Sequence, residues 1–479
     1  MRAFLCEKMK KHKIYSNCIK VLADTITPVG AYLKMRDHYP NALLLESSDY
    51  HSKEDSFSFI CLQPMAGFEA TEKNYSISNI DGSSDHFEVD SMTEMTEVFK
   101  GFLSQFEEVE NENPIGICGL FGYTSFEAVQ YFEDIKFRPK SDDHKDNPDM
   151  KYQLFRYVLA IDHFKNQLYI LKYDTSPLSS DDPDFKKLYS QLKIERTEQF
   201  KFSKSGDESS NLTDQEYEDA VARGTGHCRR GDVFQVVLSR EFKQGFKGDE
   251  FNVYRSIRSI NPSPYLFYFD YGNFKLFGSS PELQISVRDN QAVIAPIAGT
   301  VKRSGNAQDD LRLAQEMREN PKEISEHIML VDLARNDLSR SAENVKVEEY
   351  AETQYYSHVI HMVSKVSGEL LEGKSSLDLY FDTFPAGTLS GAPKYRALQI
   401  IDENEPDKRN FYGGAIGYFG FDGSVNHAIV IRSILSKNNT LTYQAGAGIV
   451  VGSTPQGERK EIDNKVAAIR RAIINAVEI

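Results

Sequence analysis

The last third of the chain contains short apolar segments joined by tight-turn sequences, and this pattern constrains the fold most strongly. The segments 413–421, 425–435 and 441–451 are separated by Asp422–Gly423 and by a Lys-Asn-Asn turn. An Asp-Gly pair between alternating apolar segments predicts a two-residue hairpin, because both residues tolerate positive φ. We therefore expect a meander of antiparallel strands in this part of the chain.

Two helices are predicted to begin with a pair of glutamates three residues apart, at 322–337 and at 458–477. Residues three apart share one face of a helix, and Lys465 continues the face of the second pair. The first helix is apolar on nearly every side, which predicts burial. Acids favour helix N-termini, so each pair alone has a structural explanation, whereas converging pairs offer the carboxylate ligands of Mg²⁺. The pairs are Glu323 with Glu326, and Glu458 with Glu461.

The composition divides the chain into two folded regions. Residues 20–172 mix short strands and helices. The stretch 173–212 is rich in Ser, Asp, Pro and Lys, and we interpret it as a linker that contains one helix. The pattern of a folded region resumes at 213–477, where Thr213 and Glu216 form a capping box at a predicted helix N-terminus.

Charge and cysteine usage narrow the class of protein. The net charge of −15 argues against nucleic acid as the main partner. No apolar run reaches the roughly 18 residues of a membrane span, and the basic N-terminus lacks the apolar core of a signal peptide. The five cysteines are scattered without a CxxC pair, which argues against a disulfide framework or a cysteine–zinc site. These features predict a cytoplasmic protein, either an enzyme or a large binding protein.

Four further features fit a binding site, and each also has a structural explanation. Gly446 and Gly448 alternate along a predicted strand, which fits close approach of a ligand or of another element. The loop 386–394 either offers backbone N–H groups to an anion or is a plain turn. His361 lies among apolar residues, where a histidine is more often a satisfied core group. Arg432, in an apolar predicted strand, needs a carboxylate from a ligand or an ion pair.

Eight motifs occur in order along the chain, namely GDVFQVVLSR, NPSPY, GSSPE, PIAGT, KEISEHIMLVDLARNDL, AGTLSGAPK, YGGAIGYF and GAGIVVGSTPQGERKE. With them the chain resembles the chorismate-utilising enzymes, and most closely the anthranilate synthase component I members, over roughly residues 20–475. The resemblance implies an α/β (α+β) fold in which large antiparallel sheets pack face to face and are wrapped by helices.

The resemblance also implies a reaction and a cofactor. Members of this kind convert chorismate and ammonia to anthranilate and pyruvate. Ammonia adds at ring C2, the C4 hydroxyl leaves, and the enolpyruvyl group is then eliminated as the ring becomes aromatic. The four glutamates would surround Mg²⁺, which holds the ring carboxylate of chorismate. Glu323 and Glu458 would lie closest, and Glu326 and Glu461 would ligate directly or through water.

Further roles follow from motif position in the resemblance. Glu282 matches the acid that protonates the departing C4 hydroxyl, which requires a raised pKa, and Thr300 is expected beside it. His361 matches the histidine of the elimination step. Tyr412 and Arg432 match groups that hold the enolpyruvyl carboxylate, a task suited to the planar fork of arginine. The remaining expected substrate contacts are Thr388, Gly446, Gly448 and Lys465.

Two positions separate this chain from relatives with other products. Isochorismate and salicylate synthases carry a lysine where this chain has Gln235, and glutamine cannot activate water as a base. Aminodeoxychorismate synthases carry a nucleophilic lysine in the PIAGT motif, where this chain has Ala298. Both positions favour anthranilate synthase. The alternatives are an aminodeoxychorismate synthase component I and a catalytically silent, tryptophan-sensing homologue. The departures from the common family pattern, at 56–61 and 301–305, contain no proposed catalytic residue.

Feedback inhibition by tryptophan is a further implication of the resemblance. Glu46 and Ser47 would meet the amino group of the inhibitor, and Pro264, Tyr265 and Leu266 its indole ring. No glutamine amidotransferase motif is found in the chain. Ammonia is therefore expected from a separate amidotransferase subunit, component II, with free ammonia as a substitute.

Overall fold

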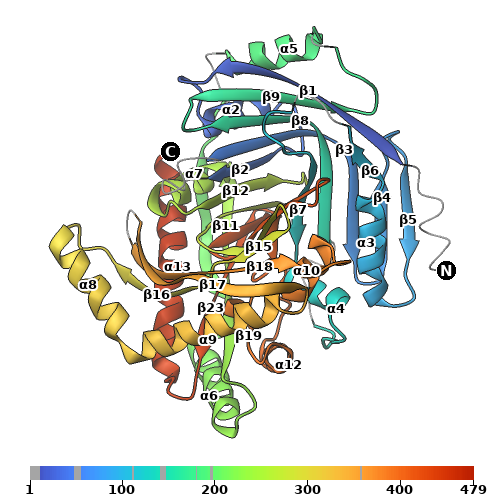
Figure 1. Ribbon diagram of the computed structural model, residues 1–479. Helices are drawn as coiled ribbons and strands as arrows, with labels where there is room; N and C mark the ends of the chain where they lie inside the picture. The colour runs from blue at the N-terminus through green and yellow to red at the C-terminus, as the bar shows by residue number, and fades with distance from the viewer. Residues whose placement is uncertain are drawn as a thin grey trace.

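The computed structural model describes residues 11–47, 56–109, 113–140, 147–179, 181–194, 198–356 and 359–479. In these ranges the protein consists of a large curved sheet surrounded by helices (Figure 1). All pairs between described strands are antiparallel except one, which joins the first strand to a short strand at 106–108. No helix in these ranges has the length and apolar character needed to cross a membrane.

The N-terminal part supplies one arm of the sheet. Its strands are β1 (His12–Leu22), β2 (Leu43–Ser47), β3 (Phe57–Thr71), β4 (Asn74–Ser78), β5 (Ser84–Glu88), β6 (Phe106–Glu108), β7 (Gly119–Thr124), β8 (Met150–Asp162) and β9 (Gln167–Asp174). Its helices are α2 (Pro28–Met35), α3 (Met95–Leu103), α4 (Val129–Phe132) and α5 (Pro183–Leu192). The long strand β8 is central, because it pairs with β3 along one edge and with β7 and β9 along the other.

The C-terminal part supplies the other arm and most of the helices. Its strands are β10 (Phe202–Ser210), β11 (Gln235–Gly248), β12 (Tyr265–Asp270), β13 (Lys275–Ser280), β14 (Leu283–Arg288), β15 (Gln291–Ile294), β16 (Ile297–Lys302), β17 (Ala342–Tyr355), β18 (Val359–Leu370), β19 (Gly391–Ala392), β20 (Ala415–Gly420), β21 (Val425–Ile429), β22 (Ser433–Lys437) and β23 (Thr440–Ile449). Its helices are α6 (Asp214–Arg230), α7 (Phe251–Ile260), α8 (Ala307–Glu319), α9 (Pro321–Leu338), α10 (Ser376–Thr383), α11 (Gly387–Ser390), α12 (Lys394–Asn404) and α13 (Pro455–Asn475).

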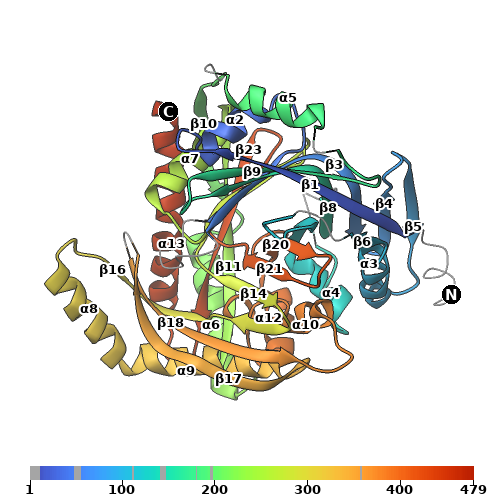
Figure 2. The ribbon, with the colours of Figure 1, turned by 45° about the horizontal axis from the view of Figure 1, so that its top comes forward.

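Two strand pairs join the arms into one sheet, which Figure 2 shows from a second side. β7 pairs with β20, and β2 pairs with β12 in a register that sets Ser47 opposite Tyr265 and Glu46 opposite Leu266. The expected fold of antiparallel sheets and surrounding helices is confirmed. Motifs that are far apart in the sequence therefore become neighbours across a strand pair, which is how two distant segments can form one pocket.

Aromatic side chains fill part of the space between the arms. Tyr152 of β8 lies with its ring centroid 4.9 Å from that of Phe419 on β20, and Phe99 of α3 lies 5.3 Å from Tyr152. All three side chains are buried. Such ring pairs add about 0.5–1.5 kcal/mol each beyond the burial of their area, so this cluster holds the two arms and a covering helix together.

The predicted hairpin and both glutamate helices are confirmed, with one correction. The hairpin between β20 and β21 turns at Asp422 and Gly423, and Gly423 has a φ of 86°. Helix α9 was expected to be buried on every side, but Ile328 is 45% exposed. The helix packs on β16, β17 and β18 with one face, which leaves Ile328 on the outer face in solvent.

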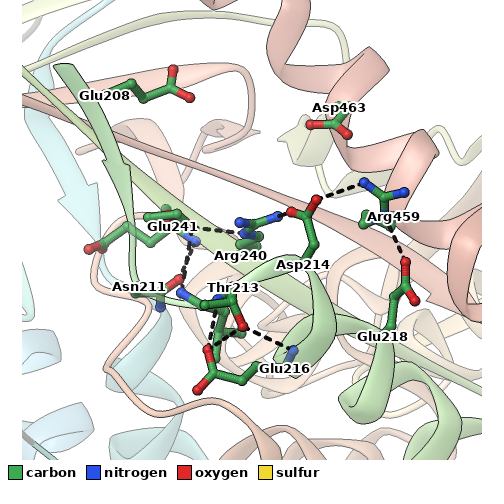
Figure 3. A network of polar contacts seen from close by, with 12 residues as sticks. Glu208, Asn211, Thr213, Asp214, Glu216, Glu218, Arg240, Glu241, Arg459 and Asp463 are labelled. Atoms are coloured by element: carbon green, nitrogen blue, oxygen red, sulfur yellow. Dashed lines mark hydrogen bonds and ion pairs between the residues drawn. The ribbon is translucent and has the colours of Figure 1, made fainter.

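Ion pairs hold α13, the second glutamate helix, against its neighbours (Figure 3). Arg459 forms pairs of 2.8 Å with both Asp214 and Glu218 of α6. Asp214 also pairs with Arg240 of β11 at 2.7 Å. Because Arg459 follows Glu458 directly, these contacts fix the first turn of α13 relative to α6 and β11.

The polar segment 202–211 corrects part of the predicted linker. Residues 202–210 form β10, which pairs with β11. Most side chains of β10 are exposed. Because an edge strand with a solvated face needs few apolar residues, its composition resembles that of a linker. The preceding helix, α5, lies within the predicted linker, as expected.

Two C-terminal segments also differ from expectation. Residues 425–435 were predicted as one strand, but β21 ends at Ile429 and β22 begins at Ser433. The break occurs because β21 pairs with β14 whereas β22 pairs with β13, a change of partner that an unbroken apolar pattern does not reveal. The loop 386–394 contains the short helix α11 and the two-residue strand β19.

Candidate active site and a second pocket

The strand pair β16–β18 brings two predicted catalytic residues together. Thr300 lies opposite His361, and the Thr300 hydroxyl is 2.9 Å from His361 Nδ1. Gly299 has a φ of 72° and interrupts the strand register, as in a β-bulge. A Cβ at Gly299 would lie 3.2 Å from Oε2 of Glu323. Glycine at this position therefore allows the first glutamate of α9 to approach the Thr300–His361 pair.

The His361 ring is held in its neutral form. Its pKa is lowered to about 4, mainly by burial and further by the Arg432 cation, while the Gly299 carbonyl opposes the change. Nδ1 contacts the Thr300 hydroxyl and lies 3.4 Å from the Gly299 carbonyl oxygen. The Gly299 carbonyl can only accept a hydrogen bond, so in the tautomer that donates to it Nδ1 carries the ring proton and Nε2 has the lone pair that can accept a proton.

The pKa of Glu282, just before β14, is shifted in the opposite direction to that of His361. It is 7% exposed, and its carbonyl oxygen accepts a hydrogen bond of 3.0 Å from the Ile429 N–H. Burial raises its pKa to about 7, while the Thr388 hydroxyl and the Arg432 and Lys465 cations oppose the rise. A cavity of about 30 Å³ lies against Glu282 and Thr388. The carboxyl can therefore carry a proton near neutral pH.

Arg432 lies in the break between β21 and β22 rather than within a strand. Its φ of 51° is in the left-handed region, which costs a non-glycine residue about 1–2 kcal/mol. Its carbonyl oxygen accepts a hydrogen bond from the Ser279 N–H, and Nη1 lies 3.5 Å from Oδ1 of Asn261. Burial lowers the pKa of its guanidinium, and the charge of Glu282 opposes this. The strand break thus places one cation near both Glu282 and His361.

The four glutamates of the two helix N-termini influence one another's charge. The pKa of Glu326 is raised first by burial and then by Glu323 and Glu461. The pKa of Glu458 is also raised first by burial, and Glu461 adds to it. The cations that oppose both rises are Lys322 and Lys465. The two helices therefore converge, and their carboxylates repel one another.

The donor set suits a hard divalent cation in chemistry and charge. Carboxylate oxygens are ligands of Mg²⁺, and a cation would relieve the repulsion that adds to the effect of burial on these pKa values. Across the described ranges, no group of three or more His, Cys, Asp or Glu side chains is arranged as a finished metal site. Glu461 pairs instead with Lys465 at 2.7 Å, and Lys465 Nζ donates to the Gly446 carbonyl oxygen at 2.9 Å.

The two predicted glycines of β23 make room for side chains of the protein itself. A Cβ at Gly446 would lie 2.7 Å from the Tyr412 hydroxyl, and one at Gly448 would lie 2.2 Å from Nε2 of Gln235. Burial is the main cause that raises the Tyr412 pKa. Oε1 of Gln235 is buried and has no hydrogen-bond partner among the described residues. The glycines therefore allow Tyr412 and Gln235 to pack directly on this strand.

A larger cavity, of about 490 Å³, lies between the two arms of the sheet. It is lined by residues of β2, β3, β12, β14, β20 and β21 and of the segment 115–117. The structure places all five residues of the predicted tryptophan site in its lining, namely Glu46, Ser47, Pro264, Tyr265 and Leu266. The strand pair β2–β12 thus forms one pocket from two distant motifs.

The pocket carboxylate of Glu46 has partners that the sequence did not reveal. Arg258 Nε donates to both carboxylate oxygens at 3.0 Å, and the Tyr254 hydroxyl donates to Oε1 at 2.5 Å. Both partners lie on α7, and no local motif links that helix to β2. Near the glutamates, Lys322 was also missed, although its place beside Glu323 in the first helical turn was visible in the sequence.

A family model for chorismate binding enzymes matches residues 44–471. Among curated proteins, anthranilate synthase component 1 of Aquifex aeolicus (strain VF5) is 36% identical over 477 residues, which covers 96% of this chain and 94% of the relative. The chain therefore belongs to the chorismate-utilising enzyme family. Over nearly its full length it is related to anthranilate synthase component I.

Solved structures agree with this fold. The crystal structure of anthranilate synthase component I from Streptococcus pneumoniae TIGR4 matches with a TM-score of 0.76 and 30% identity, over 95% of this chain and 100% of the other. The menaquinone-specific isochorismate synthase of Escherichia coli matches with a TM-score of 0.72 and 18% identity, over 98% and 97%. At that identity the second match concerns the fold alone.

Proposed function

We propose that this chain is the synthase component of an anthranilate synthase, which converts chorismate and ammonia to anthranilate, pyruvate and water. The observation that carries this proposal is that the pKa values of two side chains near Arg432 are shifted in opposite directions. Glu282 has a pKa of about 7 and can hold a proton, whereas His361 has a pKa of about 4 and is neutral. Groups whose environments separate their pKa values in this way are suited to acid and base roles in one site.

In the first stage, a bond forms between the nitrogen of ammonia and ring C2, and the bond between C4 and its hydroxyl breaks. Glu282 donates its proton to the departing hydroxyl, which leaves as water, and the new ammonium group loses a proton. Thr388 lies near this carboxyl. General acid catalysis of this kind contributes about 10²–10⁴-fold to a rate.

In the second stage, the proton on C2 is transferred to Nε2 of His361, and the bond between C3 and the enolpyruvyl oxygen breaks. The ring becomes aromatic, and the released enol takes up a proton to give pyruvate. Thr300 holds the opposite ring nitrogen at 2.9 Å, so it orients the imidazole for this transfer.

The remaining residues bind the two carboxylates of chorismate. Arg432 and Tyr412 hold the enolpyruvyl carboxylate, where a guanidinium fork suits two oxygens. Mg²⁺, when bound, supplies positive charge for the ring carboxylate. The residues that would hold the metal are Glu323, Glu326, Glu458 and Glu461, and Lys465, beside Glu461, would add a cation at this end of the substrate.

Ammonia is favoured over water as the nucleophile by two side chains. Gln235 is buried at the start of β11 and offers no base, which water requires and ammonia does not. Ala298, opposite Met362, offers no nucleophile, which argues against the covalent route of aminodeoxychorismate synthases. Ammonia would come from glutamine through a separate amidotransferase subunit, in keeping with the component 1 name of the relatives.

Tryptophan is the proposed ligand of the second pocket. Its volume of about 490 Å³ lies in the range of small-molecule sites, roughly 300–1,000 Å³. Glu46 and Ser47 would receive the ammonium end, with Pro264, Tyr265 and Leu266 against the indole. Because Arg258 already neutralises Glu46, Ser47 would contribute much of the polar recognition.

The test is product analysis with chorismate, ammonium chloride and Mg²⁺. The proposal predicts fluorescent anthranilate and an equal amount of pyruvate, dependent on ammonium and lost after chelation with EDTA until Mg²⁺ is returned. Isochorismate or salicylate as the product would contradict the role of Gln235. Aminodeoxychorismate would contradict the role of Ala298, and a protein that binds tryptophan without any turnover would be the silent homologue.

A further inference from the structure

A buried ion pair lies behind the proposed site and takes no part in the chemistry above. Arg409 is 3% exposed and Glu405 is 5% exposed. Nε of Arg409 donates to one carboxylate oxygen at 2.7 Å, and Nη2 donates to the other at 2.5 Å. Such a two-point contact fixes the planes of both groups.

The guanidinium also donates to two backbone carbonyls from different elements. Nη1 donates to the Leu389 oxygen of α11 at 2.8 Å, and Nη2 donates to the Val237 oxygen of β11 at 2.7 Å. Leu389 follows Thr388 directly, and Val237 lies two residues beyond Gln235. One side chain of Arg409 therefore ties together the segments that carry two residues of the proposed site.

The carboxylate side of the pair extends the network along β11. Oε1 of Glu405 accepts hydrogen bonds of 2.8 Å from both the N–H and the hydroxyl of Ser239. Ser239 lies opposite Gly446 in the β11–β23 pair, and its hydroxyl also accepts from Nε2 of Gln444. The contacts thus reach the part of β23 on which Tyr412 packs.

Tyr412 is held from the same centre. The Arg409 guanidinium carbon lies 5.6 Å from the centroid of the Tyr412 ring and 4.6 Å from that of Phe126. The Tyr412 N–H donates to the Arg409 carbonyl oxygen at 3.1 Å. The Arg409 N–H in turn donates to Glu127 at 2.8 Å. Both the backbone and the ring of Tyr412 are thereby set relative to Arg409.

Stability alone is a poor explanation for this pair. Burying two charges costs several kcal/mol per ion, and apolar residues of similar volume often give equal or greater stability. Lysine could neutralise Glu405, but a point charge has no planar fork that also reaches two carbonyls. What arginine adds at this position is a fixed arrangement of the segments around it.

We propose that Arg409, oriented by Glu405, is a positioning residue for the reaction proposed above. It holds α11, the start of β11 and Tyr412 in one arrangement, and this arrangement sets the geometry in which chorismate binds. The inference rests on the proposed function, since its effect is expressed through chorismate.

The test compares Arg409→Lys with a matched Arg36→Lys control. Arg36 also makes a two-point pair with a carboxylate, Asp249, and lies 5.3 Å from the Phe251 ring centroid. It contributes nothing to the proposed site. Displacement of a binding group by about 1 Å can cost up to about 10²-fold. We expect Arg409→Lys to raise the KM for chorismate about 10- to 100-fold with a smaller change in kcat, and Arg36→Lys to leave this KM unchanged at a similar loss of thermal stability.

Each outcome decides the proposal. A KM for chorismate within twofold of wild type in a folded Arg409→Lys protein would overturn it, and so would an equal rise in Arg36→Lys. If Arg409→Lys does not fold, Glu405→Gln is judged by the same KM criterion. If the wild type forms anthranilate and the variants have an unaltered KM for chorismate, the positioning role alone is refuted. A wild type that forms no anthranilate would refute the proposed function, and the positioning role with it.

Discussion

Two cavities of this protein, one beside Glu282 and one between the arms, are built from the same sheet but for different physical tasks. The region around Glu282 and His361 is dense in charged groups, and burial raises the pKa of Glu282 to about 7 and lowers that of His361 to about 4. The pocket between the arms holds about 490 Å³, and its carboxylate, Glu46, is already paired with Arg258. The first region is suited to moving protons, and the second to recognising shape.

The difference follows from where the strands end. At the β21–β22 break, the left-handed backbone of Arg432 places its guanidinium near the buried Glu282. At the β2–β12 pair, the register is regular and sets Ser47 opposite Tyr265. Irregular backbone thus marks the proposed catalytic region, and regular pairing marks the pocket. Substitutions in one region should therefore leave the function of the other largely intact.

The largest expected effect is that of Glu282→Gln. The amide cannot donate a proton to the leaving hydroxyl, so kcat should fall about 10²–10⁴-fold, measured as anthranilate fluorescence at saturating chorismate and ammonium. Glu316→Gln, an exposed substitution of the same kind on α8, should retain the wild-type rate. Full activity in Glu282→Gln would show that Glu282 is not the proton donor.

The pH dependence of Glu282 gives an independent check. For the acid role, kcat should fall as pH rises through about 7. Because the pKa of Glu282 in the folded protein lies above its ordinary value of 4.5, the folded state is favoured when this carboxyl is protonated. This contribution to the free energy of unfolding is fully present below about pH 4.5 and is lost as the pH rises through about 7. Glu282→Gln, although inactive, should therefore be more stable than wild type at pH 8, by on the order of 2–3 kcal/mol. Chemical denaturation at pH 5 and pH 8 measures this difference.

His361→Gln should cost about 10²-fold, at the lower end of the range for a general base. Amination does not need this ring, whereas elimination does, so an aminated and not yet aromatic intermediate should accumulate. Chromatography of a quenched reaction would detect it. Loss of activity with no intermediate would assign His361 to an earlier step.

Ser47→Phe should act on the other region. A ring at this position fills the proposed ammonium end of the pocket and removes a hydroxyl. The loss of a hydrogen bond to a charged group costs about 1.5–3 kcal/mol, or about 10- to 150-fold in tryptophan affinity. The KM for chorismate, measured without tryptophan, should be unchanged. Unaltered inhibition by tryptophan would place the effector elsewhere.

Arg258→Lys should have the smallest effect. Lysine retains a charge beside Glu46, but it does not hold the carboxylate plane as Arg258 Nε does through both oxygens, so Glu46 is less well oriented toward the tryptophan ammonium group. A loss of about 0.5–1.5 kcal/mol of binding free energy, the net contribution of one hydrogen bond, corresponds to about 2- to 12-fold weaker tryptophan binding. Isothermal titration calorimetry resolves a change of this size. Stronger binding would show that Arg258 competes with the ligand for Glu46.

Local patterns predicted the elements that depend on local physics. The hairpin at Asp422–Gly423 follows from turn chemistry, and the helices that begin near Glu323 and Glu458 follow from acids at helix N-termini and, for the first helix, from its apolar composition. The convergence of these helices was proposed from the motif resemblance, and the structure brings their acids near one another. The roles assigned to these residues stay predictions.

Features that depend on strand partners were not visible in the sequence. The break at Arg432 reflects a change of partner between β21 and β22. The strand at 202–210 is an edge strand whose solvated side chains resemble a linker. The network of Arg409 joins elements through backbone carbonyls, which carry no sequence information. In each case the structure of a segment depends on contacts with residues that are distant from it in the sequence.

The most direct test of whether catalysis and tryptophan binding belong to separate regions is a tryptophan titration by calorimetry. The proteins to titrate are wild type, Glu282→Gln and Ser47→Phe. We expect that, with no chorismate present, Glu282→Gln binds tryptophan with an affinity within about twofold of wild type, as for a substitution distant from the pocket, although it forms almost no anthranilate. Ser47→Phe should form anthranilate at the wild-type rate and bind tryptophan weakly. Loss of tryptophan binding in Glu282→Gln, or of catalysis in Ser47→Phe, would contradict the division between the two regions.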